Sequence, residues 1–278
     1  MDSIIWRGMT RGELDAAYNN SAAFKNSTEK LAEWSARSAR TRSRPGVLLD
    51  LQYGRRPRNR IDVFQCGRAQ APLFAFIHGG YWQRNSKEIF ACMAEGVLAN
   101  GFDAALLGYT LAPEATLTDI VDEIRRAIQW LRVQGPRLGI AAEKILLSGW
   151  SAGGHLTAAA LAEADAGLAI SGIFDLEPIR FCYLNEKLGL DAEQARRNSP
   201  LLNLPARAAK FSIAYGSDEL PELKRQSREF RTAWSAHGLP EEMIEVAGCH
   251  HYAVLEQLAQ PDGLLAKALA VFAGTDPG

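Results

Sequence analysis

The sequence has no cysteine pair at CxxC spacing, no long apolar run and almost no net charge. Its cysteines, Cys66, Cys92, Cys182 and Cys249, are widely separated, which argues against a zinc site and against a disulfide-stapled secreted scaffold. No apolar run reaches the roughly 18 residues that a membrane-spanning helix needs. A net charge of −1 creates no field that would attract nucleic acid or an anionic membrane. We therefore expect reduced thiols and neither nucleic-acid nor membrane partners.

The first twenty residues also lack the features of a targeting signal. They begin with an acidic residue and contain only a short apolar patch, so we expect a cytosolic protein. The chain has 278 residues, of which 47% are apolar and 23% charged, enough to bury a substantial core. We expect a single domain over residues 1–278, with a helical N-terminal segment at 1–45.

Apolar strand patterns alternate with helical patterns over most of the chain. The segment 60–67 alternates like a half-buried strand, with Asp62 on the opposite phase to Ile61 and Val63, and 72–80 reads as a continuous buried strand. Further strands are expected within 102–109, 144–149, 166–172, 210–217 and 243–248, and helices within 86–99 and 116–134, after Ser151, after Asp218 and at the C-terminal end. This alternation predicts an α/β fold, a mostly parallel central sheet with helices on both faces.

Residues 173–205 interrupt the alternation, because no strand pattern occurs in them. The segment carries Phe174, Phe181 and Tyr183. A helical insertion at the carboxyl end of a strand would lie above a site there, so we expect a small lid that supplies pocket walls. The alternative is that these aromatic residues only pack the insertion onto the body of the domain.

The segment "KILLSGWSAGGHLTAAA" places Ser151 in a Gly-x-Ser-x-Gly motif between a strand and a helix. A serine on such a sharp turn is exposed at a helix N-terminus, and glycines at 149 and 153 remove side chains that would collide with the adjoining elements. Chance alone would produce roughly 0.1 such motifs in this composition, so the strand and helix context carries the argument. We expect Ser151 to be a nucleophile.

A serine nucleophile needs a base, and the base needs an orienting carboxylate. Two later strand ends offer both: Asp218 follows one, and His250 and His251 follow the next. We predict Asp218 as the acid and His251 as the base. The alternatives are that Asp218 caps the following helix while Glu219 is the true carboxylate, and that His250 is the base.

An oxyanion hole is the third requirement of this chemistry. The glycines of "FIHGGYW" allow backbone amides to turn toward Ser151, so we predict the amides of Gly79, Gly80, Tyr81 and Ala152 as its donors. His78 reads as a structural anchor of that loop. No metal or organic cofactor is required.

Together, "HGGYW", "GWSAGGH", "CHHY" and the order serine, aspartate, histidine make the chain resemble the α/β-hydrolase superfamily. Within it the resemblance is to the hormone-sensitive-lipase-like esterases, and most strongly to their kynurenine formamidase (arylformamidase) branch. It extends to "LDAAYNN", "YGRRPRNRIDVF" and "GSDELPELKRQS". It implies an α/β-hydrolase fold, with Ser151 as nucleophile, Asp218 as orienting acid and His251 as base. Two residues depart from the pattern of this branch. Trp150 stands directly before the nucleophile and His250 directly before the base, where the branch commonly has other residues.

Aromatic residues that neighbour these groups in sequence predict a small apolar pocket. The pocket residues we expect are Tyr81, Trp82, Trp150, Tyr183 and Tyr252. The partner is then a small ester or amide with an aromatic group, and a homodimer stays open. We expect an arylformamidase-like serine hydrolase; a broad short-chain carboxylesterase and a non-catalytic binding protein on the same fold are the alternatives.

Overall fold

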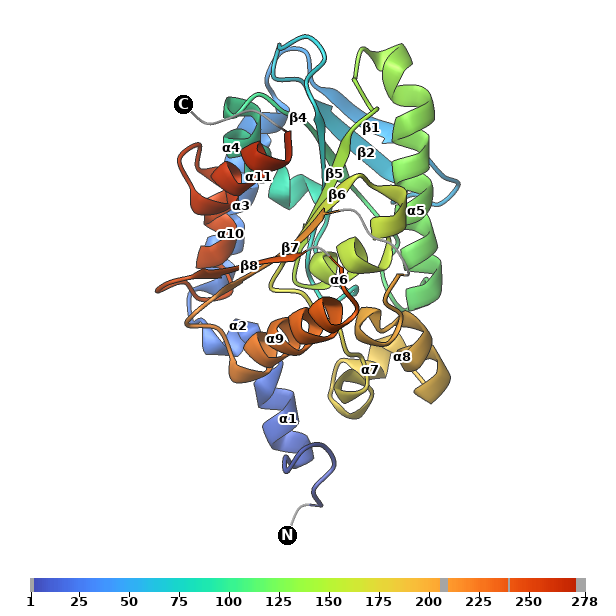
Figure 1. Ribbon diagram of the computed structural model, residues 1–278, viewed down its shortest axis with the longest axis vertical. Coiled ribbons are helices and arrows are strands. Elements are labelled where there is room, and N and C mark those ends of the chain that lie inside the picture. The colour runs from blue at the N-terminus through green and yellow to red at the C-terminus, as the bar shows by residue number, and fades with distance from the viewer. Residues whose placement is uncertain (1–2, 206–209, 240, 274–278) are drawn as a thin grey trace.

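Eight strands form one sheet in the computed structural model, which describes residues 3–205, 210–239 and 241–273 (Figure 1). The strands are β1 (Leu48–Gln52), β2 (Arg60–Phe64), β3 (Leu73–Ile77), β4 (Asp103–Leu107), β5 (Ile145–Trp150), β6 (Ala166–Ile170), β7 (Lys210–Gly216) and β8 (Glu241–Val246). Their order is β1-β2-β4-β3-β5-β6-β7-β8, and all pairs from β4 to β8 are parallel. The expected α/β fold with a mostly parallel sheet is confirmed.

Helices cover both faces of the sheet. The α-helices are α1 (Arg11–Ala17), α2 (Asn20–Ala23), α3 (Ser27–Arg42), α4 (Ala94–Ala99), α5 (Leu117–Gln134), α6 (Ala152–Ala159), α7 (Asn185–Leu188), α8 (Ala192–Asn198), α9 (Pro221–Ala236), α10 (Ala253–Ala259) and α11 (Leu264–Ala273). Short 3-10 helices occupy Lys87–Met93, Gly135–Leu138, Leu161–Glu163, Pro178–Phe181 and Pro200–Leu202. In Figure 1, α3, α4, α10 and α11 lie on one side of the sheet and α5 on the other.

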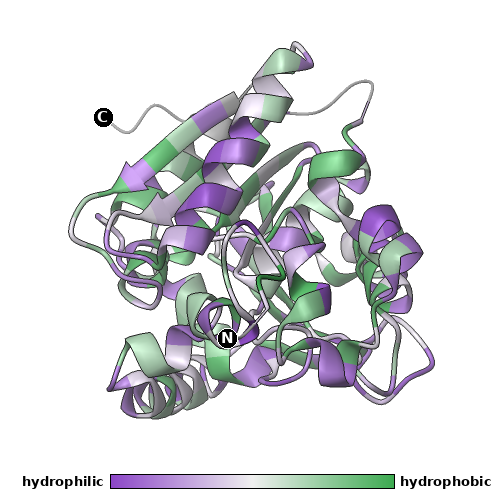
Figure 2. Cartoon of the chain, turned by 90° about the horizontal axis from the view of Figure 1, so that it is seen from below, coloured by the Kyte–Doolittle hydropathy of each residue, from purple (hydrophilic) through white to green (hydrophobic). Residues whose placement is uncertain are grey.

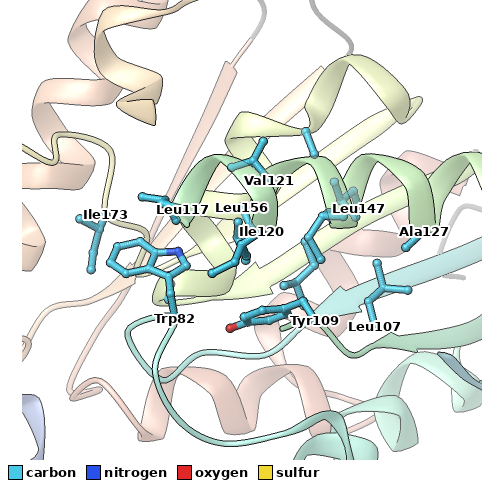
Figure 3. Close-up of a cluster of buried hydrophobic side chains, with 14 of the residues drawn as sticks. Trp82, Leu107, Tyr109, Leu117, Ile120, Val121, Ala127, Leu147, Leu156 and Ile173 are labelled. Carbon is cyan, nitrogen blue, oxygen red and sulfur yellow. The ribbon is translucent and has the colours of Figure 1, made fainter. Parts of the chain in front are cut away.

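Alternate residues of each central strand pack into two separate cores, because successive side chains point to opposite faces of a sheet. On β3, Leu73 and Ile77 pack with α5 in the first core, whereas Phe74 and Phe76 pack with α3 and α10 in the second. Figure 3 shows part of the first core, where Ile120 and Val121 of α5 lie near Leu147 of β5. The helices in Figure 2 carry both hydrophilic and hydrophobic residues, as this arrangement requires.

Strand β2 differs from the half-buried strand that its alternation predicts. Asp62 is fully buried, and its carboxylate accepts from Lys87 Nζ at 2.7 Å and from Arg42 Nε at 2.9 Å. The ion pairs satisfy this carboxylate beneath helix α3, so both faces of β2 are covered. Strand β1, which the patterns did not predict, pairs antiparallel with β2 at the sheet edge.

The insertion at 173–205 is helical but packs as part of the body. Phe174 is fully buried and stacks on Phe230 of α9, with ring centroids 4.1 Å apart. The carbonyl of Asn198 contacts His155 Nε2 at 2.7 Å, which ties α8 to α6. The packing alternative therefore describes Phe174, whereas movement of the segment as a lid stays a prediction. Across the described residues, no helix is both long and apolar enough to cross a membrane.

Candidate active site

Ser151 lies on the turn between β5 and α6, in the conformation its motif predicts. Its φ of 60° and ψ of −117° are strained for a residue with a side chain. A Cβ at Gly149 would lie 2.3 Å from the carbonyl oxygen of Gly153, and a Cβ at Gly153 only 2.1 Å from that of Ile77. Both positions therefore require glycine. The turn places Ser151 at the N-terminus of α6, where the helix dipole favours negative charge.

A buried contact joins the second histidine of the pair to a carboxylate. His251 Nδ1 lies 2.9 Å from Glu219 Oε2, and both side chains are buried. Trp150 holds the same loop, because its Nε1 donates to the carbonyl of His251 at 2.9 Å and its ring lies 4.6 Å from the imidazole. A carboxylate at Nδ1 keeps the proton there, which leaves Nε2 of the neutral ring able to accept one.

The carboxylate in this contact belongs to Glu219, so the prediction of Asp218 is wrong. Glu219 Oε1 also accepts from the amide of Gly216 at 2.8 Å and from Ser171 Oγ at 2.5 Å, which orients the carboxylate inward. Asp218 is exposed, and its carboxylate accepts from Ser217 Oγ. The turn after β7 closes with the amide of Glu219 on the carbonyl of Gly216, and this tight turn directs residue 218 outward and residue 219 inward.

His250 has a different environment from its neighbour. Its Nδ1 accepts from the amides of Tyr252 and Ala253 at 3.2 and 3.3 Å, and its ring stacks on Phe24 at 4.0 Å. Burial, with His251 nearby, lowers the pKa of His250. These contacts cap the start of α10.

Replacing the two histidines separately tests this difference. We expect His251→Ala to lower kcat at least about a thousandfold, because no base remains for the serine. His250→Ala should stay within about fivefold of wild type, since it loses only a helix cap and a stacked ring. Steady-state kinetics on a p-nitrophenyl ester measures both variants, and equal losses would contradict the assignment of His251.

One cavity brings these groups together at the carboxyl ends of the strands. Its lining residues are Asn20, Ser21, Leu31, Gly80, Tyr81, Arg84, Asn85, Trp150, Ser151, His251 and Tyr252. Of the pocket residues expected from sequence, Tyr81, Trp150 and Tyr252 lie in this wall. The walls also include residues of the N-terminal segment, which sequence reasoning missed. Their only signal was "LDAAYNN", whose last residues reach Asn20.

Two predicted pocket residues lie elsewhere. Trp82 is fully buried in the first core, where its Nε1 donates to His155 Nδ1 at 3.2 Å (Figure 3). Tyr183 is half-buried, and its backbone amide donates to Asp15 Oδ1 at 2.7 Å. Neither Trp82 nor Tyr183 lines the cavity, although Trp82 shares the first core with Tyr81, which does.

The loop after β3 brings backbone amides to the cavity. Gly80 has a φ of 124°, and a Cβ there would lie 2.3 Å from the carbonyl oxygen of Arg84, so only glycine fits. Gly80 and Tyr81 line the cavity, whereas Gly79 and Ala152 do not, although Ala152 directly follows Ser151. Among the described residues, no protein atom accepts from the amides of Gly80, Tyr81 or Ala152.

His78 and His155 stay neutral supports of the site. The Nδ1 of His78 lies 2.8 Å from the carbonyl of Gly79, and the ring stacks on Tyr109 at 4.3 Å. Burial lowers the pKa of each imidazole to about 4. His78 is therefore an anchor of the loop, as expected. Within the described residues, no group of three or more His, Cys, Asp or Glu side chains could hold a metal ion.

Comparisons with known proteins point to one group of enzymes. The family described as BD-FAE matches residues 61–173, from β2 through the Ser151 turn. Kynurenine formamidase of Danio rerio is 28% identical over 307 residues, covering 97% of this chain and 98% of that protein. A structure from Silicibacter sp. TM1040, provisionally described as a thioesterase, has a TM-score of 0.82 and 30% identity, covering 91% of this chain and 97% of its own. The Pyrobaculum calidifontis esterase, at 16% identity, has a TM-score of 0.75 over 95% of this chain and 97% of its own.

Proposed function

The chain belongs to the α/β-hydrolase family, and on that premise we propose that it is a serine hydrolase that cleaves a small carboxylic ester or an aryl formamide. The observation that carries the proposal is the buried contact between His251 and Glu219 at a cavity that Ser151 also lines. A hydroxyl, an imidazole and a carboxylate in this order are the groups that acyl transfer to water requires.

The reaction proceeds in two halves. His251 Nε2 takes the proton of Ser151 Oγ as the oxygen attacks the substrate carbonyl carbon, and the carbonyl oxygen becomes an oxyanion. The free amides of Gly80, Tyr81 and Ala152 donate to this oxyanion. The intermediate collapses, the C–O or C–N bond breaks, and His251 returns the proton to the leaving alcohol or amine. Water then repeats the sequence on the acyl-enzyme, which releases the carboxylic acid and free Ser151.

Glu219 acts through His251 and is a positioning residue. Its carboxylate holds the proton on Nδ1 and stabilises the imidazolium that forms when His251 takes the serine proton. The bonds from Gly216 and Ser171 fix the carboxylate before the substrate arrives. Trp150 adds to this by holding the backbone of His251.

The cavity favours an aryl formamide over a simple ester. Tyr81, Trp150 and Tyr252 offer aromatic walls, while the small space beside Ser151 suits a formyl group. Arg84 is the one cavity-lining side chain with a fixed charge, and no described carboxylate lies within ion-pair distance of it. A substrate that carries a carboxylate away from its reacting group would complement it. The similarity to kynurenine formamidases over nearly the whole chain supports the same choice.

A broad short-chain carboxylesterase is the second candidate, supported by the fold shared with esterases. A non-catalytic binding protein is disfavoured because the nucleophile, base and carboxylate are all present. A cytosolic location and a homodimer stay predictions.

Substrate comparison separates the two enzymatic candidates. We expect kcat/KM to be higher for N-formylkynurenine and formanilide than for p-nitrophenyl acetate. Arg84→Gln should lower the ratio of kcat/KM for N-formylkynurenine to that for formanilide about fivefold, because the charged hydrogen bond to the carboxylate is lost. Arg68→Gln, an exposed arginine away from the cavity, is the matched control. An ester preference of tenfold or more would instead identify a carboxylesterase.

A further inference from the structure

The hydroxyl of Tyr81 is anchored by a short segment near the N-terminal end. It donates to the carbonyl of Tyr18 at 2.5 Å and accepts from Asn20 Nδ2 at 2.9 Å. All three residues are buried. We call residues 18–24 the N-terminal strap. The strap therefore satisfies the hydroxyl of Tyr81 both as donor and as acceptor, while the backbone of Tyr81 faces the cavity.

The loop that carries Tyr81 needs such anchors because its backbone is strained. Tyr81 and Trp82 have φ values of 51° and 60°, a region that side chains disfavour. Trp82 is held by its bond to His155 and by the amide of Ala112, which donates to its carbonyl at 2.8 Å. For Tyr81, the side-chain anchors come from the strap. A residue in a disfavoured conformation persists only where its surroundings enforce it.

The strap also contacts the other loops of the site. Tyr18 Oη donates to Glu222 Oε2 at 3.2 Å and accepts from Gln226 Nε2 at 3.0 Å, both on α9, which follows the loop of the buried carboxylate. Ser21 Oγ lies 3.4 Å from Tyr252 Oη, beside the histidine loop. Figure 1 shows α2 lying beside α9 at this end of the molecule. One segment thus contacts the loop of Tyr81, the helix that follows the loop of the buried carboxylate, and Tyr252 beside His251.

From these contacts we propose that the strap positions the backbone amides of Gly80 and Tyr81 for the oxyanion, through the side chain of Tyr81. The proposal rests on the proposed function, because the amides stabilise an oxyanion only if acyl transfer occurs. Tyr81 and Asn20 are positioning residues in this scheme. Displacing a preset donor by a fraction of an ångström slows the steps that form the oxyanion while leaving substrate binding almost unaffected.

The test compares two buried tyrosines with the same hydrogen-bond pattern. Tyr81→Phe removes the anchor, whereas Tyr53→Phe removes a hydroxyl that donates to the carbonyl of Gly108 and accepts from Asn59, outside the cavity lining. On p-nitrophenyl acetate, Tyr81→Phe should lower kcat about tenfold with KM within about twofold. It should slow phosphonylation of Ser151 by a fluorophosphonate in the same proportion. Tyr53→Phe should change neither rate more than about twofold, even with a similar fall in Tm.

Equal changes of kcat in the two phenylalanine variants, or a change confined to KM, would overturn the proposal. Should Tyr81→Phe fail to fold, Asn20→Ala replaces it. Its kcat is expected to fall about threefold, and the result is compared with that of Tyr53→Phe in the same way. If the fluorophosphonate does not label Ser151 in the wild-type protein, the proposed function itself fails. If it labels wild type and Tyr81→Phe at equal rates, only the role of the strap fails.

Discussion

Replacing Ser151 with alanine is expected to lower kcat at least about a thousandfold on any ester or formamide that the wild-type protein hydrolyses. The variant keeps the cavity and the free amides but has no oxygen to form the acyl-enzyme. The residual rate is that of water attacking a substrate held against the oxyanion donors. Stopped-assay kinetics with each substrate measures the loss, and mass spectrometry after fluorophosphonate treatment should show label on Ser151 in wild type alone.

Ser148→Ala is the matched control for this variant. Ser148 lies on β5, the strand that leads to Ser151, is fully buried and donates to the carbonyl of Leu168 at 2.8 Å, so its variant tests the effect of removing a nearby serine hydroxyl. We expect its kcat within about threefold of wild type. A Ser151→Ala variant that retained a tenth of the activity would refute the nucleophile assignment.

Glu219→Gln should lower kcat by about a thousandfold or more, comparable to the loss when the acid of such a triad becomes an amide. The amide keeps the shape of the carboxylate, and its oxygen can still accept from Gly216 and Ser171. Its NH2 group then faces His251 Nδ1, which has to accept a hydrogen bond. The ring proton moves to Nε2, where it blocks removal of the serine proton.

The Asp218→Asn variant tests whether Glu219 is the orienting acid or Asp218, which the sequence alone favours. Asp218 is exposed, and its carboxylate accepts from Ser217 Oγ of the same turn, so its variant should retain kcat within about twofold. The same ester assay compares both variants, with near-ultraviolet circular dichroism as the check on folding. A larger loss for Asp218→Asn than for Glu219→Gln would restore Asp218 as the orienting acid.

The sequence predicts the sheet and the position of Ser151 well, because both depend on local patterns. Buried parallel strands need continuous apolar runs, and the turn after β5 needs glycines where a Cβ would collide with backbone oxygens. The sequence predicts β2 as a strand but not the burial of Asp62, which depends on Lys87 and Arg42 from distant segments. No local pattern carries that information.

The choice between neighbouring residues was beyond the sequence. Asp218 and Glu219 are adjacent carboxylates after the same strand, and the direction of one turn decides which meets His251. Similarly, Tyr81 and Trp82 are adjacent aromatics in left-handed conformations, and both join the first core, but only Tyr81 lines the cavity. A one-residue difference in a turn rotates a side chain to the other side of the chain, which composition and spacing do not report.

By itself, the sequence determined that this chain forms an alternating strand and helix fold with a serine on a strained turn and a histidine after the last strand. Only the tertiary structure decided that Glu219 contacts His251, that His250 caps a helix and that residues of the N-terminal strap line the cavity. The physical reason is the separation along the chain over which each effect acts. Periodicity and steric clashes act between near neighbours in the chain, whereas a hydrogen bond such as that between Asn20 and Tyr81 depends on where distant segments meet.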